Sequence, residues 1–296
     1  MIKKNIPNFF TLCNLLCGCI AIVFAFENNL VWAAYMVGFS CLFDFLDGMV
    51  ARMLDAHSEI GKQLDSLADM VSFGVVPGIM MFKLLSISCG VVWATEIAEK
   101  ISHSGQMQVA DTMAILFPPI LSFLIPIFSA IRLAKFNIDL RQSNSFIGLP
   151  TPASSIFICS LPLIINLKPF PYESLYNGAL SVSANALGVT FNPLQYLLGE
   201  NPSFERVLLI NPIFLSCLIV VISLLLIAPL PLFALKFKNF LWADNKVRYV
   251  FLVLSLVLLI VFKFVGIPLI IILYIILSVL NNLVSKNKNA TPTNYE

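Results

Sequence analysis

Charged residues are scarce in this sequence. Only 11% of its 296 residues are Asp, Glu, Lys or Arg, while 59% are hydrophobic; an average soluble domain has about 25% charged residues. No soluble domain, internal repeat or long low-complexity linker stands out. The apolar runs are continuous rather than alternating, which argues against a membrane-spanning β-barrel. Runs of about 18 residues or more can each cross a hydrocarbon core, so we expect an all-α, polytopic transmembrane helical bundle.

The sequence also has few histidines and no cysteines at the spacing of a metal site. The chain has two histidines and seven cysteines, and none of them shows the spacing of a zinc site. Most of the cysteines lie inside the apolar runs. His103 lies in one of two polar interruptions, at about 87–112 and 168–206, and neither interruption contains a recognisable chemical cluster. The sequence therefore gives no support for a histidine- or thiolate-bound metal.

The basic residues alternate between the loops. Thirteen of the 18 lysines and arginines fall on one side of the predicted spans, which by the positive-inside rule is the cytoplasmic side. We therefore expect a multi-pass protein of a bacterial-type inner membrane, with both termini in the cytoplasm. The sequence predicts eight spans, near 9–26, 31–55, 62–86, 113–136, 151–167, 207–235, 248–263 and 266–284. The number eight depends on a break between the last two spans at Gly266–Pro268.

Four aspartates lie within 26 residues of this apolar chain. A carboxylate at membrane depth costs about 2.5 kcal/mol or more, so an intramembrane acid indicates a functional site. Counted from the connecting turn, the two pairs reach matching depths, about 12–20 Å into their helices. Helical periodicity also places each pair on one stripe. The stripes consist of Asp44, Asp47, Gly48 and Ala51 on the first helix, and of Gly61, Asp65, Asp69 and Ser72 on the second.

This cluster has the chemistry of a hard-cation site. Carboxylates this close repel one another and need counter-charge. Because every ligand is oxygen, we expect Mg²⁺ or Mn²⁺, as one ion or two, with Ca²⁺ also compatible. Gly48 and Gly61 remove side chains beside the acids, although small residues are also ordinary at helix crossings in membranes. Arg52 lies one turn towards the cytoplasm, where a guanidinium can bind phosphate. Together these features predict phosphoryl-type transfer.

The spacing of this segment resembles the signature of the CDP-alcohol phosphatidyltransferase family. Pro7, Asn8, Thr11, Asn14 and Gly18 also resemble the opening helix of that family. The resemblance covers roughly residues 5–227, which implies a six-helix core with two additional C-terminal helices. The signature positions are Asp44, Asp47, Gly48, Ala51, Arg52, Gly61, Asp65 and Asp69.

The resemblance also implies roles for these residues. Members transfer a substituted phosphate from a CDP-linked donor to an alcohol and release CMP. Asp44, Asp47, Asp65 and Asp69 would bind the metal, and Asp69 would also be the base that deprotonates the acceptor. The residues that would bind cytidine and its phosphates are Pro7, Asn8, Thr11, Gly48, Ala51, Arg52 and Gly61.

The residues after the third and fourth aspartates resemble those of serine-accepting members. Ser66 and Met70 stand where phosphatidylglycerophosphate and cardiolipin synthases typically have proline and lysine. The resemblance therefore implies transfer of a phosphatidyl group from CDP-diacylglycerol to the hydroxyl of L-serine. A set of polar residues is assigned to the serine carboxylate or the lipid phosphate, although Arg132 and Lys135 also fit a purely topological role. The set is Ser72, Arg132, Lys135 and Asn137.

Two rival functions remain open. The acceptor could be another alcohol, such as glycerol 3-phosphate or inositol phosphate. The acids could instead form a divalent-cation transporter, although transporters usually place such groups near the midplane on broken helices. We expect membrane lipid as the surroundings, no nucleic-acid partner, and a homodimer. The expected organisation is a membrane core at 1–235, a two-helix extension at 236–285 and a polar tail at 286–296.

Overall fold

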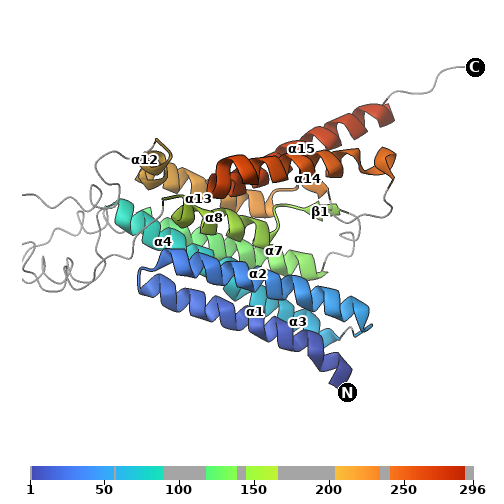
Figure 1. Ribbon diagram of the computed structural model, residues 1–296, viewed down its shortest axis with the longest axis horizontal. Helices are drawn as coiled ribbons and strands as arrows, with labels where there is room; N and C mark the ends of the chain where they lie inside the picture. The colour runs from blue at the N-terminus through green and yellow to red at the C-terminus, as the bar shows by residue number, and fades with distance from the viewer. Residues whose placement is uncertain are drawn as a thin grey trace, which may run out of the picture.

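The computed structural model describes residues 2–56, 58–89, 118–138, 145–165, 204–233 and 241–290. Figure 1 shows a bundle of helices that run roughly along one common axis, with the start of the first helix and the end of the last helix at the same end of the bundle. An even number of crossings has this consequence. The structure does not describe the histidine and acids of the 87–112 interruption, the whole 168–203 segment or His57.

The first two helices form an antiparallel hairpin. Helix α1 spans Ile2–Phe26 and α2 spans Leu30–Met53. The turn between them uses Asn28, which has a φ of 54°, a left-handed conformation that asparagine tolerates better than most residues. Asn29 then caps α2 by accepting a hydrogen bond from the Trp32 amide at 3.4 Å. These two helices agree with the predicted spans.

The third span is one helix with a change of pitch in its middle. It consists of α3 (Glu59–Asp69), the π-helix η1 (Met70–Val75) and α4 (Val76–Ser88). Ser58 caps its start by accepting a hydrogen bond from the Gly61 amide at 3.0 Å. The sequence pattern predicted one span at 62–86, and the structure has one continuous helix from Glu59 to Ser88, but the π-helical turn within it was not predicted. π-Helical turns occur often at functional sites, and this one begins directly after Asp69.

Three further apolar segments complete the six-span core. They are the residues from Pro118 through η2 (Leu121–Phe123) and α7 (Leu124–Ile138), then α8 (Thr151–Ile165), and then α12 (Phe204–Ile210) followed by α13 (Pro212–Ile227). The predicted span 207–235 is wrong at both ends. Pro212 separates α12 from α13, where Asn211 caps α13 by accepting from the Ile213 and Phe214 amides at 3.0 and 3.1 Å.

A short antiparallel ribbon follows α13. Strand β1 (Ser145–Ile147) pairs with β2 (Pro231–Phe233), with Phe146 opposite Leu232. The chain then enters a C-terminal hairpin of α14 (Trp242–Phe262), η4 (Lys263–Val265) and α15 (Gly266–Ala290). The predicted break between the last two spans is confirmed, and it begins at Lys263, whose φ is 51°. Helix α15 continues to Ala290, beyond its predicted end at 284.

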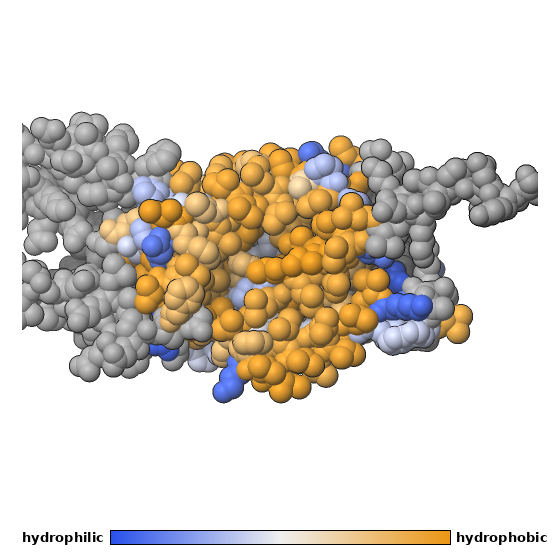
Figure 2. All heavy atoms as spheres, turned by 90° about the horizontal axis from the view of Figure 1, so that it is seen from above, coloured by the Kyte–Doolittle hydropathy of each residue, from blue (hydrophilic) through white to orange (hydrophobic). Residues whose placement is uncertain are grey.

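The hydrophobic side chains are distributed as a membrane protein requires. The described residues contain five long stretches that can cross a membrane, of which Asn245–Leu283 comprises the two helices α14 and α15, and two shorter apolar helices, α8 and α13. Figure 2 shows a surface that is mostly apolar across its middle, with hydrophilic residues gathered towards the ends. The chain is therefore an integral membrane protein of all-α architecture, as predicted, with eight apolar helical segments among the described residues.

Two clusters of buried side chains hold the bundle together. The larger one joins α1, α2, α4, α8 and α13, and includes Phe73, Met80 and Leu85. The smaller one joins the ribbon to the C-terminal hairpin through Leu149, Leu232, Phe251, Ile271 and Tyr274. The hairpin is thus attached to the core beside the start of α8.

Candidate active site

Three of the four aspartates converge. Asp44 and Asp47 extend from α2 and Asp65 extends from α3, and one carboxylate oxygen of each lies within 4.8 Å of the others. Hard divalent cations bind carboxylate oxygens at about 2.0–2.6 Å, so oxygens this far apart can share one ion. Asp47 is buried, with 7% of its surface exposed. The donor set and its spacing therefore fit a hard divalent cation.

Thr11 on α1 positions one of these carboxylates. Its hydroxyl donates a hydrogen bond to Oδ2 of Asp47 at 2.7 Å, and it also lies 3.2 Å from the carbonyl oxygen of Pro7. Thr11 is itself buried. The sequence assigned Thr11 to nucleotide binding, and the structure shows that it also orients an acidic side chain.

Asp69 lies outside the group of three. Its Oδ1 accepts a hydrogen bond from Nδ2 of Asn14 at 3.4 Å. Asn14 is fully buried, and Ser40 on α2 donates to its side-chain oxygen while Ser72 donates to its backbone carbonyl at 3.2 Å. Asn14 therefore connects α1, α2 and η1 at the fourth aspartate. The sequence pattern related Asn14 only to the opening helix of the family, and its position as a polar residue inside an apolar helix was the signal for this role.

A polar cavity of about 790 Å³ opens beside the three carboxylates, between α1, α2 and α3. Such a volume is within the range of small-molecule sites. Asp47 and Asp65 line it directly. All seven residues predicted to bind the nucleotide line it as well, namely Pro7, Asn8, Thr11, Gly48, Ala51, Arg52 and Gly61.

Two glycines shape this cavity in different ways. A Cβ added at Gly48 would meet no atom within 4 Å, so this glycine leaves the cavity open. A Cβ added at Gly61 would lie 2.9 Å from Oδ1 of Asn8 and 2.9 Å from the Ser58 hydroxyl. Gly61 therefore allows α3 to approach α1 closely. The sequence predicted that both glycines remove side chains beside the acids; Gly48 leaves open space, whereas Gly61 permits a close approach of neighbouring side chains.

The residues predicted to bind serine or lipid phosphate do not form one cluster. Ser72 donates to Asn14, and Asn137 donates to the Ser66 hydroxyl at 2.9 Å, which joins α7 to α3. Lys135 is exposed. Arg132 is buried, with 7% of its surface exposed.

Arg132 has an unusual environment for a buried cation. Its Nη1 donates to the Thr151 hydroxyl at 3.3 Å, its guanidinium lies 6.0 Å from the Phe136 ring centre, and its Nε has no hydrogen-bond partner among the described residues. The Asp69 carboxylate attracts it electrostatically. A guanidinium buried without a close anion is costly, so this position favours an anionic ligand. Thr151 was not among the predicted site residues.

The geometry defines a class before any relative is considered: a multi-helix membrane protein with an intramembrane carboxylate site beside a polar cavity. The profile of the CDP-alcohol phosphatidyltransferase family matches residues 4–191, which include all of this site. The chain belongs to the CDP-alcohol phosphatidyltransferase family, and it is an enzyme of that family.

Several curated relatives carry one name, CDP-diacylglycerol–serine O-phosphatidyltransferase. The relative from Helicobacter pylori is 30% identical over 257 residues, which are 85% of this chain and 93% of the relative. The relative from Bacillus subtilis is 29% identical over 168 residues, covering 54% of this chain and 77% of its own length. The relative from Methanocaldococcus jannaschii is 29% identical over 162 residues, covering 55% and 62%.

Proposed function

We propose that this protein transfers the phosphatidyl group of CDP-diacylglycerol to the hydroxyl of L-serine, releasing CMP. The serine oxygen attacks the lipid-bearing phosphorus, the bond from that phosphorus to the CMP oxygen breaks, and the serine hydroxyl proton passes to a carboxylate. The observation that carries the proposal is the group of Asp44, Asp47 and Asp65 at the edge of the polar cavity. The shared name of the relatives supports serine as the acceptor.

The three converging aspartates would hold Mg²⁺ or Mn²⁺. Their oxygen-only chemistry and their 4.8 Å spacing fit such an ion. The ion would neutralise charge on the phosphate oxygens and on the leaving group. Thr11 orients Asp47 for this role, and Arg52 at the cavity edge would bind a phosphate of the nucleotide.

Asp69 would be the general base. It is separate from the group of three, and Asn14 binds only its Oδ1 among the described hydrogen bonds. Its Oδ2 accepts no hydrogen bond from the described residues and would take the proton of the serine hydroxyl. A base fixed by one oxygen and open at the other is the arrangement that proton transfer needs.

Arg132 would bind the serine carboxylate. Of the two cations that the sequence left open, Lys135 is exposed whereas Arg132 is buried. Arg132 also lies within electrostatic range of Asp69 and has a free Nε among the described residues. A guanidinium binds a carboxylate with two parallel hydrogen bonds, which would place the serine hydroxyl on the Asp69 side. Thr151 would hold the guanidinium in position.

The organisation and orientation of the chain are part of the proposal. We assign residues 1–235 to a membrane core and 236–285 to a hairpin extension, and the smaller cluster of buried side chains connects the two. A polar tail at 286–296 would follow. The start of α1 and the end of α15 lie at one end of the bundle (Figure 1), and we assign that end and the active site to the cytoplasm. A homodimer in the inner membrane remains our prediction.

Acceptor choice decides between this function and its neighbours. Purified protein is incubated with CDP-diacylglycerol, Mg²⁺ or Mn²⁺, and one labelled acceptor: L-serine, glycerol 3-phosphate or inositol phosphate. We expect label in lipid only with serine, with one CMP released per lipid formed. Label from another acceptor would overturn the assignment of serine, and cation uptake into vesicles without lipid product would favour transport.

A further inference from the structure

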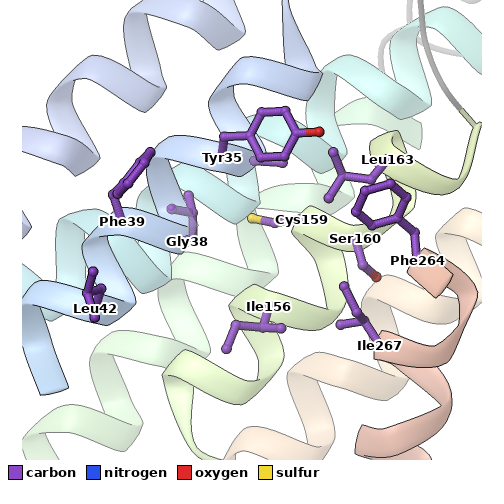
Figure 3. A pocket seen from close by; sticks show the side chains of 12 residues that line it. Tyr35, Gly38, Phe39, Leu42, Ile156, Cys159, Ser160, Leu163, Phe264 and Ile267 are labelled. Atoms are coloured by element: carbon purple, nitrogen blue, oxygen red, sulfur yellow. The ribbon is translucent and has the colours of Figure 1, made fainter. Parts of the chain in front are cut away.

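A second cavity lies in the apolar part of the bundle. Its volume is about 410 Å³, and it is an open cavity bordered by α2, α8 and the turn of the C-terminal hairpin. Figure 3 shows α2 residues along one side, α8 residues opposite, and Phe264 and Ile267 from the hairpin. The residues at the wall are almost all apolar. They include Gly38, Leu42, Ile156, Leu163, Phe264 and Ile267.

One face of α2 connects this cavity with the polar one. Arg52, Phe45 and Gly38 are seven residues apart in turn, which on a helix places them within about 40° of one another. Arg52 lines the polar cavity and Gly38 lines the apolar one. Between them, Phe45 and Leu42 are 61% and 50% exposed. A molecule with a phosphate at Arg52 would therefore have an apolar path along α2, open to the lipid on its side.

The hairpin turn forms the wall farthest from the aspartates. In Figure 3, Leu42 and Phe264 stand at opposite ends of the labelled residues. Leu42 is two residues before Asp44, so its end of the cavity is the one nearer the carboxylates. Phe264 and Ile267 belong to η4 and the start of α15. A hydrocarbon chain that enters near Leu42 would meet these two side chains at its far end.

We propose that one acyl chain of the lipid donor occupies this cavity, and that Phe264 and Ile267 limit its length. The inference rests on the proposed function, because it takes CDP-diacylglycerol as the donor. Lipid tails are as apolar as the cavity wall, so entry gains little from the hydrophobic effect. Selection comes instead from van der Waals fit and from steric exclusion of chains that are too long.

Gly38→Leu tests the near part of the cavity. A Cβ at Gly38 would meet no atom within 4 Å, so the backbone has space for a side chain there, and Gly38 lines the cavity that this side chain would narrow. The enzyme is given two CDP-diacylglycerols at once, with 10-carbon and 18-carbon chains, and the ratio of the two lipid products is measured by mass spectrometry. We expect the variant to shift this ratio towards the short donor by roughly tenfold. An unchanged ratio contradicts the proposal.

Phe264→Ala tests the far wall in the opposite direction. Removing the ring lengthens the cavity, so the ratio should shift towards the long donor. Phe262→Ala is the matched control, because Phe262 is in the same turn and similarly exposed, at 49% against 43%, but does not line the cavity. Equal shifts of the product ratio in both variants would mean that the ratio responds to any destabilisation of the turn, and would overturn the role of Phe264.

A binding measurement keeps this inference separate from the function. A CDP-diacylglycerol with a photoreactive group at the end of one acyl chain is added to the protein. The mixture is irradiated, and the labelled residues are identified by mass spectrometry of peptides. We expect labelling at the hairpin turn that excess unlabelled CDP-diacylglycerol suppresses and phosphatidylcholine does not. Suppression by both lipids alike would identify an ordinary membrane-lipid site. If labelling is as expected but serine is not converted, the acyl site holds and the proposed function fails.

Discussion

The two cavities of this protein share α2 but are built in opposite ways. The polar cavity is lined by residues from only two nearby stretches, 7–11 and 47–65, and its side chains are oriented by hydrogen bonds such as that from Thr11 to Asp47. The apolar cavity brings together residues 34–42, 156–163 and 264–267, which only packing of distant helices can do. The polar cavity is therefore determined by residues close together in the sequence, whereas the shape of the apolar cavity is determined by the packing of distant helices.

Of all the changes proposed here, removal of the metal from the polar cavity should have the largest effect on activity. Chelation of divalent cations should lower serine transfer to background, and Mg²⁺ or Mn²⁺ should restore it. Asp47→Asn should reduce kcat by about a thousandfold or more, because metal stabilisation of the transition state amounts to several kcal/mol. The measurement is CMP release in the presence and absence of added metal.

Asp55→Asn provides the matched control for that variant. Asp55 is an exposed aspartate just beyond the end of α2, with a φ of 48°, a conformation that asparagine also adopts. The change of chemical group is the same, but Asp55 does not line the polar cavity. Equal loss in both variants, or full activity in the chelator, would refute metal binding at the three aspartates.

Replacing Asp69 should separate chemistry from binding. Asp69→Asn preserves the shape of the side chain and removes its basicity, so we expect kcat to fall by about 10²–10⁴-fold. Binding of CDP-diacylglycerol should change little, because Asp69 lies outside the group of three carboxylates. Single-turnover CMP release and equilibrium donor binding are the two measurements. A variant with normal turnover would remove Asp69 from the role of base.

Arg132 should affect the acceptor alone. Arg132→Lys keeps the positive charge but loses the planar pair of donors, so we expect the KM for serine to rise by about tenfold. The KM for CDP-diacylglycerol should stay within about twofold. Lys135→Gln is the discriminating variant: if Lys135 holds the carboxylate instead, its serine KM will rise and that of Arg132→Lys will not.

The sequence predicted the polar cavity far better than the apolar one. Asp44, Asp47 and Asp65 meet because helical periodicity and distance from one turn determine their relative positions, and both can be counted from the sequence. The π-helix after Asp69 could not be predicted from such residue spacing. It forms where α1 and α7 both pass close to η1, since a Cβ added at Gly18 would strike Ser72 and one at Gly74 would lie 3.2 Å from Cβ of Ser129.

Long-range contacts account for the other omissions. Arg132 and Thr151 are 19 residues apart with six undescribed residues, 139–144, between their helices, and no periodicity relates them. The ribbon between β1 and β2 joins residues more than 80 positions apart. An apolar residue in a membrane helix also looks the same in sequence whether it faces lipid, another helix or a cavity. The sequence alone therefore could not predict the apolar cavity, which depends on how the helices pack.

The smallest expected effect is at the contact between the hairpin and the ribbon. The hydroxyl of Tyr274 on α15 donates to the carbonyl of Phe233 in β2 at 2.9 Å, and its ring packs on Phe233 and Phe251 with centres 5.0 and 5.7 Å apart. Tyr274→Phe keeps the ring and removes the hydrogen bond, which contributes about 1 kcal/mol. We expect the melting temperature to fall by about 2–4 °C.

This variant also tests whether the hairpin influences the acceptor site. Strand β2 pairs with β1, which leads through Gly148 and Leu149 to Thr151, the partner of Arg132. Loosening β2 should therefore raise the KM for serine by about twofold, with the donor KM unchanged. Tyr35→Phe makes the same chemical change at a hydroxyl for which no hydrogen bond is described, and should leave the melting temperature unaltered. Matching melting temperatures for the two variants would show that the hairpin is held by packing alone, and a serine KM that does not move would separate it from the acceptor site.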